Sequence, residues 1–369
     1  MALLSRGRRP LPVGWGIVGT GSIAHAFASD LAQSDNPHVT AVCSRSPERA
    51  RAFALGHSGA TRTGKLRSVK PYSDLAAMLA DPVVEMVYVA TLNTAHREVV
   101  IEALRAGKPV LCEKPLATSA EDALEMAREA RRRDVLLMEA VWTRHLPAVR
   151  AAAELLERGA IGRLVAVRGD LSVSRPFDPS SRLFDPEQGG GALLDLGIYP
   201  LSLAIKFAGA PDYVEGRWWR NRAGTDSRAE MTLTCGVGDG AVDVRLACGF
   251  TQRNENRFIL QGTRGALVLD KTLGPTKLTV HEKPLDPLPE ASASSDPVSA
   301  VLNWIPGVGS STRTQAYPFE GHGLLQQAHR MATCVRDALT ECPEMSLDDS
   351  IATLNVIDAI LSDPPAGEV

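Results

Sequence analysis

The stretch GWGIVGTGSIA, residues 14–24, joins a short apolar strand to a glycine-rich turn. The turn fits the dinucleotide-binding pattern Gly-x-Gly-x-x-Gly/Ala. Its first glycine permits the tight turn, its second lets the backbone approach a pyrophosphate, and its small third residue packs helix on strand. A helix is expected from Ala24 to Gln33, and the pyrophosphate would bind the N–H groups at its start. A bare glycine turn is also an ordinary strand-to-helix connection, so the flanking strand and helix are what favour a nucleotide site. The candidate residues are Gly19, Thr20, Gly21, Ser22 and Ile23.

The chain around this turn alternates strands with helices from about Val13 to Ala140. Further strands are expected at 38–43, 86–90, 110–112 and 135–138, and helices at 47–55, 75–79, 98–106 and 119–133. Strands that are regularly separated by helices imply right-handed βαβ units and a parallel sheet. The sequence therefore predicts a doubly wound Rossmann domain over residues 13–140, preceded by a flexible tail at 1–12.

The pattern changes after about residue 160. Apolar residues at every second position from Val242 to Phe250 predict a strand with one apolar face. Similar segments occur at 164–168, 231–237, 258–261 and 266–269. Residues 141–369 are therefore predicted to form a C-terminal α+β domain with a large, mainly antiparallel open sheet. The stretch at about 283–320 is rich in Pro, Ser and Ala, which predicts a long irregular loop.

The residues after the strand at 38–43 bear on the choice between NAD and NADP. An NAD site usually has an Asp or Glu there, which binds the adenosine ribose. Here the strand is followed by Ser44 and Arg45. A guanidinium and a hydroxyl suit a 2′-phosphate, and no carboxylate stands in these positions to repel it. NADP is therefore favoured, with NAD as the second choice and a solvated surface arginine as the alternative role of Arg45.

The strand at 110–112 is followed by Glu113-Lys114-Pro115. Open α/β sheets bind ligands outside the carboxyl ends of their strands, so Lys114 would place a cation near the reactive end of the nucleotide. Thr91, Asn93 and His96 follow the strand at 86–90 and are expected at the same edge. His96 has two open roles, one in catalysis and one at the helix start. A dinucleotide turn combined with a fixed cation indicates an enzyme.

A third signal is the segment GGGALLDLGIYP, residues 189–200. If a helix begins near residue 192, Asp195 and Tyr199 stand four residues apart on one face. The glycines would let the backbone pass close to a ligand. Pro200 fits only if the helix has barely begun at that point. Without further context, the Asp–Tyr pair is as consistent with a structural role as with a functional one.

Four motifs in this order, GTGSIA, TLNTAH, CEKP and GGGALLDLGIY, resemble the glucose–fructose oxidoreductase/inositol dehydrogenase (Gfo/Idh/MocA) family. The resemblance covers nearly the whole chain. Within the family, LMEAVWTRHLP at 137–147 and the tyrosine of GIY are similar to the branch of dimeric dihydrodiol dehydrogenases and NADP-dependent D-xylose dehydrogenases. The resemblance implies a Rossmann domain followed by an α/β domain whose open sheet carries substrate contacts and an oligomer interface.

The resemblance and the residue types together imply hydride transfer between a nicotinamide cofactor and a secondary hydroxyl or ketone of a sugar, cyclitol or dihydrodiol. Tyr199 would be the acid/base, although a phenol with a pKa of about 10 needs the ammonium of Lys114 to favour its phenolate. Lys114 would also stabilise a developing alkoxide. Asp195 would orient a neighbouring hydroxyl, Glu113 would help to place Lys114, and the candidates for the substrate wall are Trp142 and Arg144.

Two other functions remain open. One is a non-catalytic NADP-sensing regulatory protein of the same fold, which need not retain both Lys114 and Tyr199. The other is a sugar–sugar oxidoreductase that recycles a tightly held cofactor. Purified protein that already carries bound nucleotide would favour the latter.

The composition argues against several other classes. A formal net charge of −3 and a 44% hydrophobic content are those of an ordinary soluble globular protein, with no expected nucleic-acid or membrane partner. The first residues lack the apolar core of a signal peptide, and no run approaches the roughly 20 apolar residues of a membrane span. The six cysteines form no Cys-x-x-Cys pair, so we expect buried thiols in a reducing cytoplasm and no metal site. A homodimer or homotetramer through the C-terminal sheet is also expected.

Overall fold

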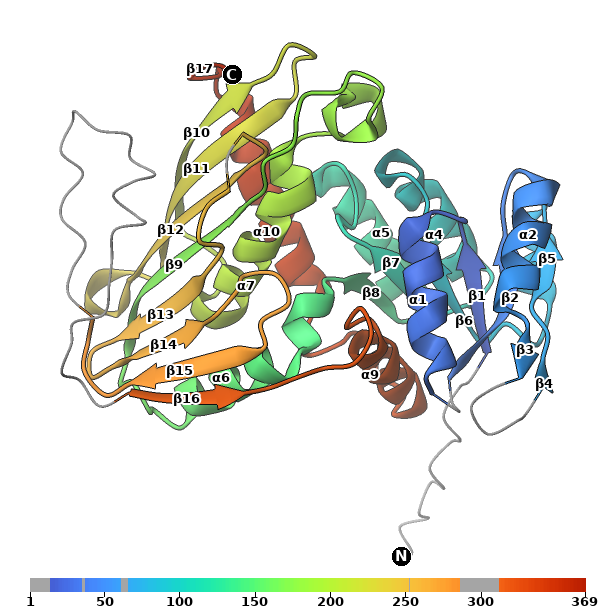
Figure 1. Cartoon of the computed structure of the whole chain (residues 1–369), viewed down its shortest axis with the longest axis horizontal. Coiled ribbons are helices and arrows are strands. Elements are labelled where there is room, and N and C mark those ends of the chain that lie inside the picture. The colour runs from blue at the N-terminus through green and yellow to red at the C-terminus, as the bar shows by residue number, and fades with distance from the viewer. Residues whose placement is uncertain (1–13, 35–36, 61–65, 252, 286–311) are drawn as a thin grey trace, which may run out of the picture. The chain divides into compact units, whose positions relative to one another are not determined.

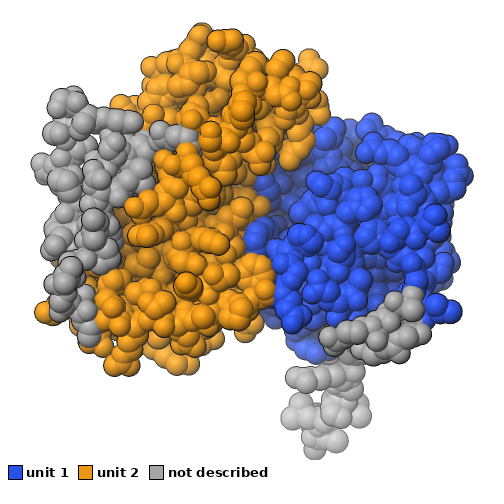
Figure 2. Space-filling view, in the orientation of Figure 1, with its two compact units in different colours: residues 1–117, 121–142, 320–347 blue, residues 118–120, 143–319, 348–369 orange. Residues whose placement is uncertain are grey.

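The computed structural model describes residues 14–34, 37–60, 66–251, 253–285 and 312–369. They form two compact units that interleave along the chain (Figure 2). The first unit comprises Met1–Ala117, Glu121–Trp142 and Glu320–Leu347, and the second comprises Thr118–Ala120, Thr143–Phe319 and Asp348–Val369. The sequence predicted a single boundary at residue 140. It did not predict that residues Glu320–Leu347 return to the first unit.

The first unit is built on a six-stranded sheet whose neighbouring strands are all parallel, in the order β5-β2-β1-β6-β7-β8. The strands are β1 (Gly14–Val18), β2 (His38–Cys43), β5 (Lys70–Tyr72), β6 (Met86–Val89), β7 (Val110–Glu113) and β8 (Leu137–Ala140). The helices of this unit are α1 (Ser22–Ala32), α2 (Pro47–His57), α3 (Leu75–Ala80), α4 (His96–Arg105), α5 (Ala120–Arg133) and α9 (Leu325–Arg336). A separate two-stranded sheet consists of β3 (Gly59–Ala60) and β4 (Leu66–Arg67).

Strands β1, β6, β7 and β8 are buried along their whole length, as expected for a parallel sheet with helices on its faces (Figure 1). The chain moves outward from β1 to β2 and β5, and then resumes on the other side of β1 with β6. Doubly wound sheets bind their ligands outside the carboxyl ends of the strands at such a reversal, which here lies between β1 and β6. The predicted Rossmann fold is confirmed.

The second unit is built on a nine-stranded sheet in the order β16-β15-β14-β13-β9-β12-β11-β10-β17. Its neighbours are antiparallel except for two parallel pairs, β9 with β12 and β10 with β17. The strands are β9 (Leu164–Ser172), β10 (Tyr213–Arg220), β11 (Asp226–Cys235), β12 (Val242–Gly249), β13 (Phe258–Gly262), β14 (Ala266–Leu269), β15 (Lys277–His281), β16 (Thr312–Ala316) and β17 (Gly367–Glu368). The predicted large, mainly antiparallel sheet is therefore confirmed.

Helices cover one face of this sheet, and its other face is polar. The main helices are α6 (Pro147–Glu157), α7 (Ile198–Ala208) and α10 (Leu347–Ser362), which lie along the sheet in Figure 1. In β11 the buried residues Ala229, Met231 and Leu233 alternate with half-buried polar ones. A Cβ on Gly216 of β10, which pairs with Met231, would lie 2.7 Å from Ile360 of α10. The apolar face of the sheet therefore packs against the helices.

Four strands of the second unit differ from the expectations. Strands β10, β15, β16 and β17 were not predicted, and β16 occupies Thr312–Ala316, inside the expected loop at 283–320. That part of the loop prediction is wrong, and residues 286–311 lie outside the described chain. All five residues of β16 are exposed, so the strand has no apolar alternation to reveal it, and only its pairing with β15 defines it.

One described helical segment, Pro186–Ala208, is long and apolar enough to span a membrane by length and composition. The sequence-based expectation of no such run is therefore wrong. The most apolar window of this segment is 78% buried inside the molecule. Such burial is what the core helix of a globular unit also shows.

Candidate active site

The glycine turn between β1 and α1 has the geometry of an anion cradle. Gly19 has a φ of +110°, and a Cβ there would lie 2.3 Å from the carbonyl oxygen of Ala90. No side chain therefore fits at this position. Gly21 precedes the first residue of α1, and a Cβ on it would meet nothing within 4 Å. Among the described residues no side chain caps α1, so its first N–H groups suit a pyrophosphate.

The residues after β2 lie at the start of α2. Ser44 is half-buried and Arg45 is exposed. Ser46 caps α2, because its hydroxyl accepts a hydrogen bond from the N–H of Arg49 at 3.2 Å. A carboxylate does stand in the first turn of the helix, but Glu48 is bound by the Ser46 hydroxyl at 2.9 Å and by Arg51 at 3.2 Å. Arg45 therefore remains the exposed cation nearest the end of β2 in sequence.

His96 is fully buried at the start of α4 and holds the turn that follows β7. Its Nδ1 lies 2.9 Å from the carbonyl oxygen of Pro115. A carbonyl only accepts hydrogen bonds, so Nδ1 carries the proton and donates. This bond favours the structural role of His96 over a direct catalytic one. Asn93, also buried, begins the short 3₁₀ helix before α4, and Thr91 precedes it.

Buried polar side chains hold the backbone on both sides of Lys114. Glu113 accepts hydrogen bonds from the Tyr88 hydroxyl and, at 3.2 Å, from the N–H of Lys114. Glu139 of β8 accepts one from the N–H of Leu116 at 2.8 Å. Burial raises the pKa of Glu113 to about 7, against the opposing effects of Tyr88 and Lys114. The predicted role of Glu113, to help place Lys114, fits this arrangement.

Sequence reasoning missed Tyr88 and Glu139. A signal for both was present, because each is a polar side chain within a short apolar strand. Burial of such a group is costly unless it forms hydrogen bonds, so a carboxylate in the run Leu137–Ala140 indicates a specific partner. Here the partner is the turn that carries Lys114.

Asp195 and Tyr199 lie in the second unit, on a helix that begins differently from the expected one. Residues Leu193–Gly197 form a π-helical turn that continues directly into α7. The N–H of Ile198 donates to the carbonyl oxygen of Leu193, five residues back. Pro200 has no N–H to donate, and its ring would crowd the carbonyl four residues back in a regular α-helix. The wider π turn before it lets the helix continue through the proline.

Charged side chains lie near Asp195 and near the start of the helical segment that carries Asp195 and Tyr199. Tyr199 is buried, and the Asp195 carboxylate lies 3.8 Å from the guanidinium of Arg182. A residue that sequence reasoning missed, Asp226 of β11, accepts a hydrogen bond from the N–H of Leu193 at 2.6 Å. Asp226 therefore anchors the start of the segment that carries both predicted site residues.

The structure gives Arg144 a different role from the predicted one. Arg144 is fully buried, and its guanidinium lies 2.7 Å from the Asp349 carboxylate of α10. A buried charge of this kind is stable only when it is paired. We therefore remove Arg144 from the substrate wall and assign it to the packing of α10. Trp142, which is half-buried, remains a prediction.

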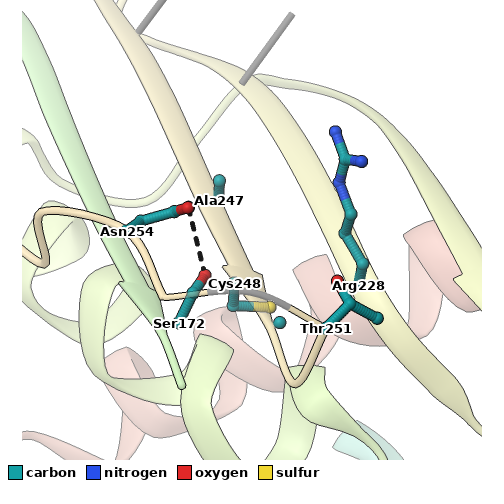
Figure 3. A pocket seen from close by; sticks show the side chains of 7 residues that line it. Ser172, Arg228, Ala247, Cys248, Thr251 and Asn254 are labelled. Carbon is teal, nitrogen blue, oxygen red and sulfur yellow. Dashed lines mark hydrogen bonds between the residues drawn. The ribbon is translucent and has the colours of Figure 1, made fainter. Parts of the chain in front are cut away.

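Figure 3 shows a shallow hollow in the second unit that has no enclosed room for a water molecule. It includes none of the predicted site residues and is lined by Ser172, Arg228, Ala247, Cys248, Gly249, Thr251 and Asn254. Asn254 donates to the Ser172 hydroxyl at 3.3 Å, while the Arg228 guanidinium binds Glu230. Ser172 and Asn254 are thus bound to each other, and Arg228 is bound to a residue outside the lining. Among the described residues, no three His, Cys, Asp or Glu side chains are grouped to hold a metal ion.

Comparisons with known proteins agree with this description. Residues 13–141 match the family model described as "Oxidoreductase family, NAD-binding Rossmann fold", and residues 149–268 match the GFO/IDH/MocA C-terminal domain. The chain is 31% identical to trans-1,2-dihydrobenzene-1,2-diol dehydrogenase of Mus musculus, over 93% of this chain and 94% of that protein. It is also 31% identical to the Homo sapiens enzyme of the same name, over 94% and 95%.

A solved structure of similar architecture is a 3-ketoreductase from Actinomadura kijaniata, in complex with NADP and TDP-benzene. Its TM-score is 0.75 at 26% identity, and the match covers 97% of this chain and 99% of that one. The family matches reach both units, and the curated relatives align along almost their whole length. This chain therefore belongs to the Gfo/Idh/MocA family of oxidoreductases, as the four sequence motifs indicated.

Proposed function

We propose that this chain is an NADP-dependent dehydrogenase or reductase that acts on a secondary hydroxyl or ketone of a small polyol. The observation that carries the proposal lies within the first unit. The glycine turn follows β1, and Lys114 follows β7, the second strand along from β1 in the same parallel sheet. Because carboxyl ends of parallel strands share one edge, the nucleotide cradle and the fixed cation lie at the same edge.

The cofactor fits the residues that the structure presents at this edge. Residues 19–23 would hold the pyrophosphate, Ser44 and Arg45 the 2′-phosphate, and Thr91, Asn93 and Lys114 the nicotinamide end. The other two predicted cofactor residues, His96 and Glu113, would act indirectly, by holding the turn that carries Lys114. When bound, the nicotinamide accepts or supplies the hydride. The open space at Gly21 and the uncapped start of α1 support this assignment. The 3-ketoreductase that this chain resembles was solved with NADP.

The chain's own side chains would handle the proton. In the oxidation, the Tyr199 phenolate accepts the proton of the substrate hydroxyl, and in the reduction the phenol returns it. The ammonium of Lys114 lowers the cost of the phenolate and stabilises negative charge on the substrate oxygen. Asp195, beside Arg182, orients a neighbouring hydroxyl of the substrate. A non-catalytic NADP sensor would need neither the Tyr199 hydroxyl nor the Lys114 ammonium.

The substrate class follows from the relatives. The two mammalian relatives are named for a dihydrodiol, and the 3-ketoreductase was solved with TDP-benzene. We therefore propose sugars, cyclitols and cyclic dihydrodiols as the compounds to test. Each would be incubated with NADP⁺ while the absorbance of the reduced nicotinamide is followed. No turnover with any of them, in a protein that binds NADP, would support the sensor instead.

Replacing Arg45 with Ala should weaken NADP binding much more than NAD binding. The expected loss is roughly 1.5–3 kcal/mol, typical of a hydrogen bond to a charged group. Fluorescence titration with both cofactors measures it. Arg51→Ala is a matched control. Arg51 is an exposed arginine like Arg45, but it lies on α2 and pairs with Glu48. Equal losses for the two cofactors, or a wild type that prefers NAD, would mean that Arg45 does not select the 2′-phosphate.

We also propose a homo-oligomer built on the polar face of the nine-stranded sheet. This face carries adjacent charges, with Arg168 of β9 bound to Asp243 of β12 at 2.5 Å and Arg245 at 3.4 Å from the same carboxylate. Light scattering at micromolar concentration should give at least twice the monomer mass, and Arg245→Asp should lower it. Arg158→Asp, at the residue that follows α6, is the control. A monomeric wild type would contradict the proposal.

A reducing, cytoplasmic setting is part of the same proposal. All six cysteines of the chain are free and buried. Free thiols are typical of the reducing compartments of a cell.

A further inference from the structure

Asp226, at the first position of β11, is a buried carboxylate that faces the start of the helical segment carrying Asp195 and Tyr199. Its Oδ2 accepts a hydrogen bond from the N–H of Leu193 at 2.6 Å. Burial raises the pKa of Asp226 to about 6, while hydrogen bonds from the backbone of Leu193 and Ala192 act in the opposite direction. A carboxylate in this position is favoured because the first N–H groups of a helix have no partners within it.

Two glycines let the backbone approach Asp226 and its neighbour Cys248. Gly191 has a φ of +122°, and a Cβ there would lie 2.1 Å from Oδ1 of Asp226. Gly197 lies against β12, where a Cβ would be 3.0 Å from the Cys248 sulfur. Any larger residue at 191 would displace the carboxylate or the helix start. Gly191 is one of the glycines that were expected to let the backbone pass close to a ligand. The close approach of Asp226 requires glycine at this position.

The π turn transmits this anchoring to the predicted site. Leu193 donates its N–H to Asp226 and accepts, through its carbonyl, the N–H of Ile198. Tyr199 is the next residue. Leu193 therefore links the Asp226 carboxylate to the hydrogen bond that defines the π turn. The width of this turn sets the position from which the Tyr199 side chain leaves the helix.

We propose that Asp226 is a positioning residue for catalysis, which holds Tyr199 and Asp195 in register through Leu193 and the π turn. The proposal rests on the proposed function, because it requires Tyr199 to handle the substrate proton. Asp226 itself does not touch the substrate in this role. It differs from a purely structural cap in that its loss should affect turnover more than stability.

The first test compares Asp226→Asn and Asp226→Ala with the wild type. Asn keeps one acceptor oxygen, so kcat should fall by roughly 10-fold, whereas Ala should cost on the order of 10²-fold, the effect of a misplacement of about 1 Å. KM for the polyol and Kd for NADP should change by less than about 3-fold, since uniform binding is retained. Hydrogen exchange in the peptide 190–205 should become faster in both variants.

The second test is a double-mutant cycle with Gly191. Gly191→Ala should lower kcat as Asp226→Ala does, because its methyl group would occupy the place of Oδ1. In the Asp226→Ala background this methyl group has room, so the second substitution should cost less than it does alone. Gly209→Ala is the control for backbone strain, since Gly209 also has a positive φ but a Cβ there would meet nothing within 4 Å.

Asp212→Asn is the control for a lost carboxylate, because Asp212 accepts a backbone N–H elsewhere in the unit, from Gly236 at 2.7 Å. If Asp226→Asn keeps wild-type kcat while Tyr199→Phe loses it, the proposed function stands and the positioning role fails. If Tyr199→Phe keeps its turnover, the proposed function fails first. If Asp226→Ala does not fold, the Asn variant and Gly191→Ala decide the question, and additive effects of these two would overturn the proposal.

Discussion

Tyr199→Phe should lower turnover by roughly 10²–10⁴-fold, the usual cost of losing a general acid/base. The substitution removes the titrating hydroxyl and leaves the ring, so the packing around this buried residue should be retained. Cofactor affinity should also be retained, because the glycine turn and Lys114 belong to the other compact unit. Turnover would be measured with the best polyol from the screen, and NADP binding by fluorescence.

Lys114→Met removes the cation at similar volume and should depress turnover as much as Tyr199→Phe or more. Under the proposed function the ammonium and the phenol serve the same proton transfer, so the double variant should be little worse than the poorer single one. Lys108→Met is a matched control in the same unit, because Lys108 donates to the carbonyl of Val84 at 2.6 Å, near the start of β7. Near-normal turnover in Tyr199→Phe would mean that the proton acceptor lies elsewhere.

His96 is a poor second choice for that acceptor. Its Nδ1 donates to the Pro115 carbonyl, and the ring is fully buried at the start of α4. A substitution of His96 should therefore act on the turn that carries Lys114. The sequence left the two roles of this histidine open, since only the folded backbone brings Pro115, 19 residues away, into contact with it.

Most of the first unit could be predicted from the sequence, because its main strands and helices have strong local signals, but β3, β4, β5 and the return of residues 320–347 were not predicted. Short apolar runs give the buried strands, and Pro47 in the first turn of α2 marks the start of that helix. The expected strand at 135–138 was two residues early, since Leu137–Ala140 forms β8. An apolar run shows that a strand exists more clearly than it shows where the strand ends.

The second unit could be predicted only where its strands alternate. Strand β12 has buried residues at Val242, Val244 and Leu246, and this pattern was visible in the sequence. In β10 the adjacent Trp218 and Trp219 break the alternation, and Trp218 is held by a hydrogen bond to the carbonyl of Asp363. The strand is defined by its pairing with β11 along its whole length, which local sequence does not encode.

Two carboxylates that hold the starts of helical segments could not be predicted, because each comes from a distant part of the chain. Asp226 acts on Leu193, 33 residues away, and Asp30 acts on Leu324, 294 residues away. Local rules search for a capping side chain at the first residue of the helix itself. In both cases a glycine of positive φ lies against the carboxylate, since a Cβ on Gly191 or Gly321 would come within 2.1 or 2.2 Å of it.

Asp30→Ala should lower the stability of the first unit by roughly 2–4 kcal/mol, because it leaves the buried N–H of Leu324 and the part-buried N–H of His322 without an acceptor. Asp30 is buried on α1 and accepts hydrogen bonds from the N–H groups of His322, at 2.9 Å, and Leu324, at 2.8 Å. It also lies 3.0 Å from Nδ1 of His322. These bonds attach the returning segment, and with it the start of α9, to the first unit.

Denaturation followed by hydrogen exchange, peptide by peptide, would test this expectation in each unit separately. Peptides from 322–336 should lose protection first, and Gly321→Ala should act in the same direction because its methyl group would displace the carboxylate. Asp74→Ala is the matched control, since Asp74 caps the exposed start of α3 through the N–H of Ala76 at 3.0 Å. Loss of such a cap typically costs about 1 kcal/mol. If Asp30→Ala costs no more than Asp74→Ala, the returning segment is held mainly by the apolar contacts of α9, such as those of the buried residues Leu324, Ala328 and Met331, and the buried carboxylate adds little.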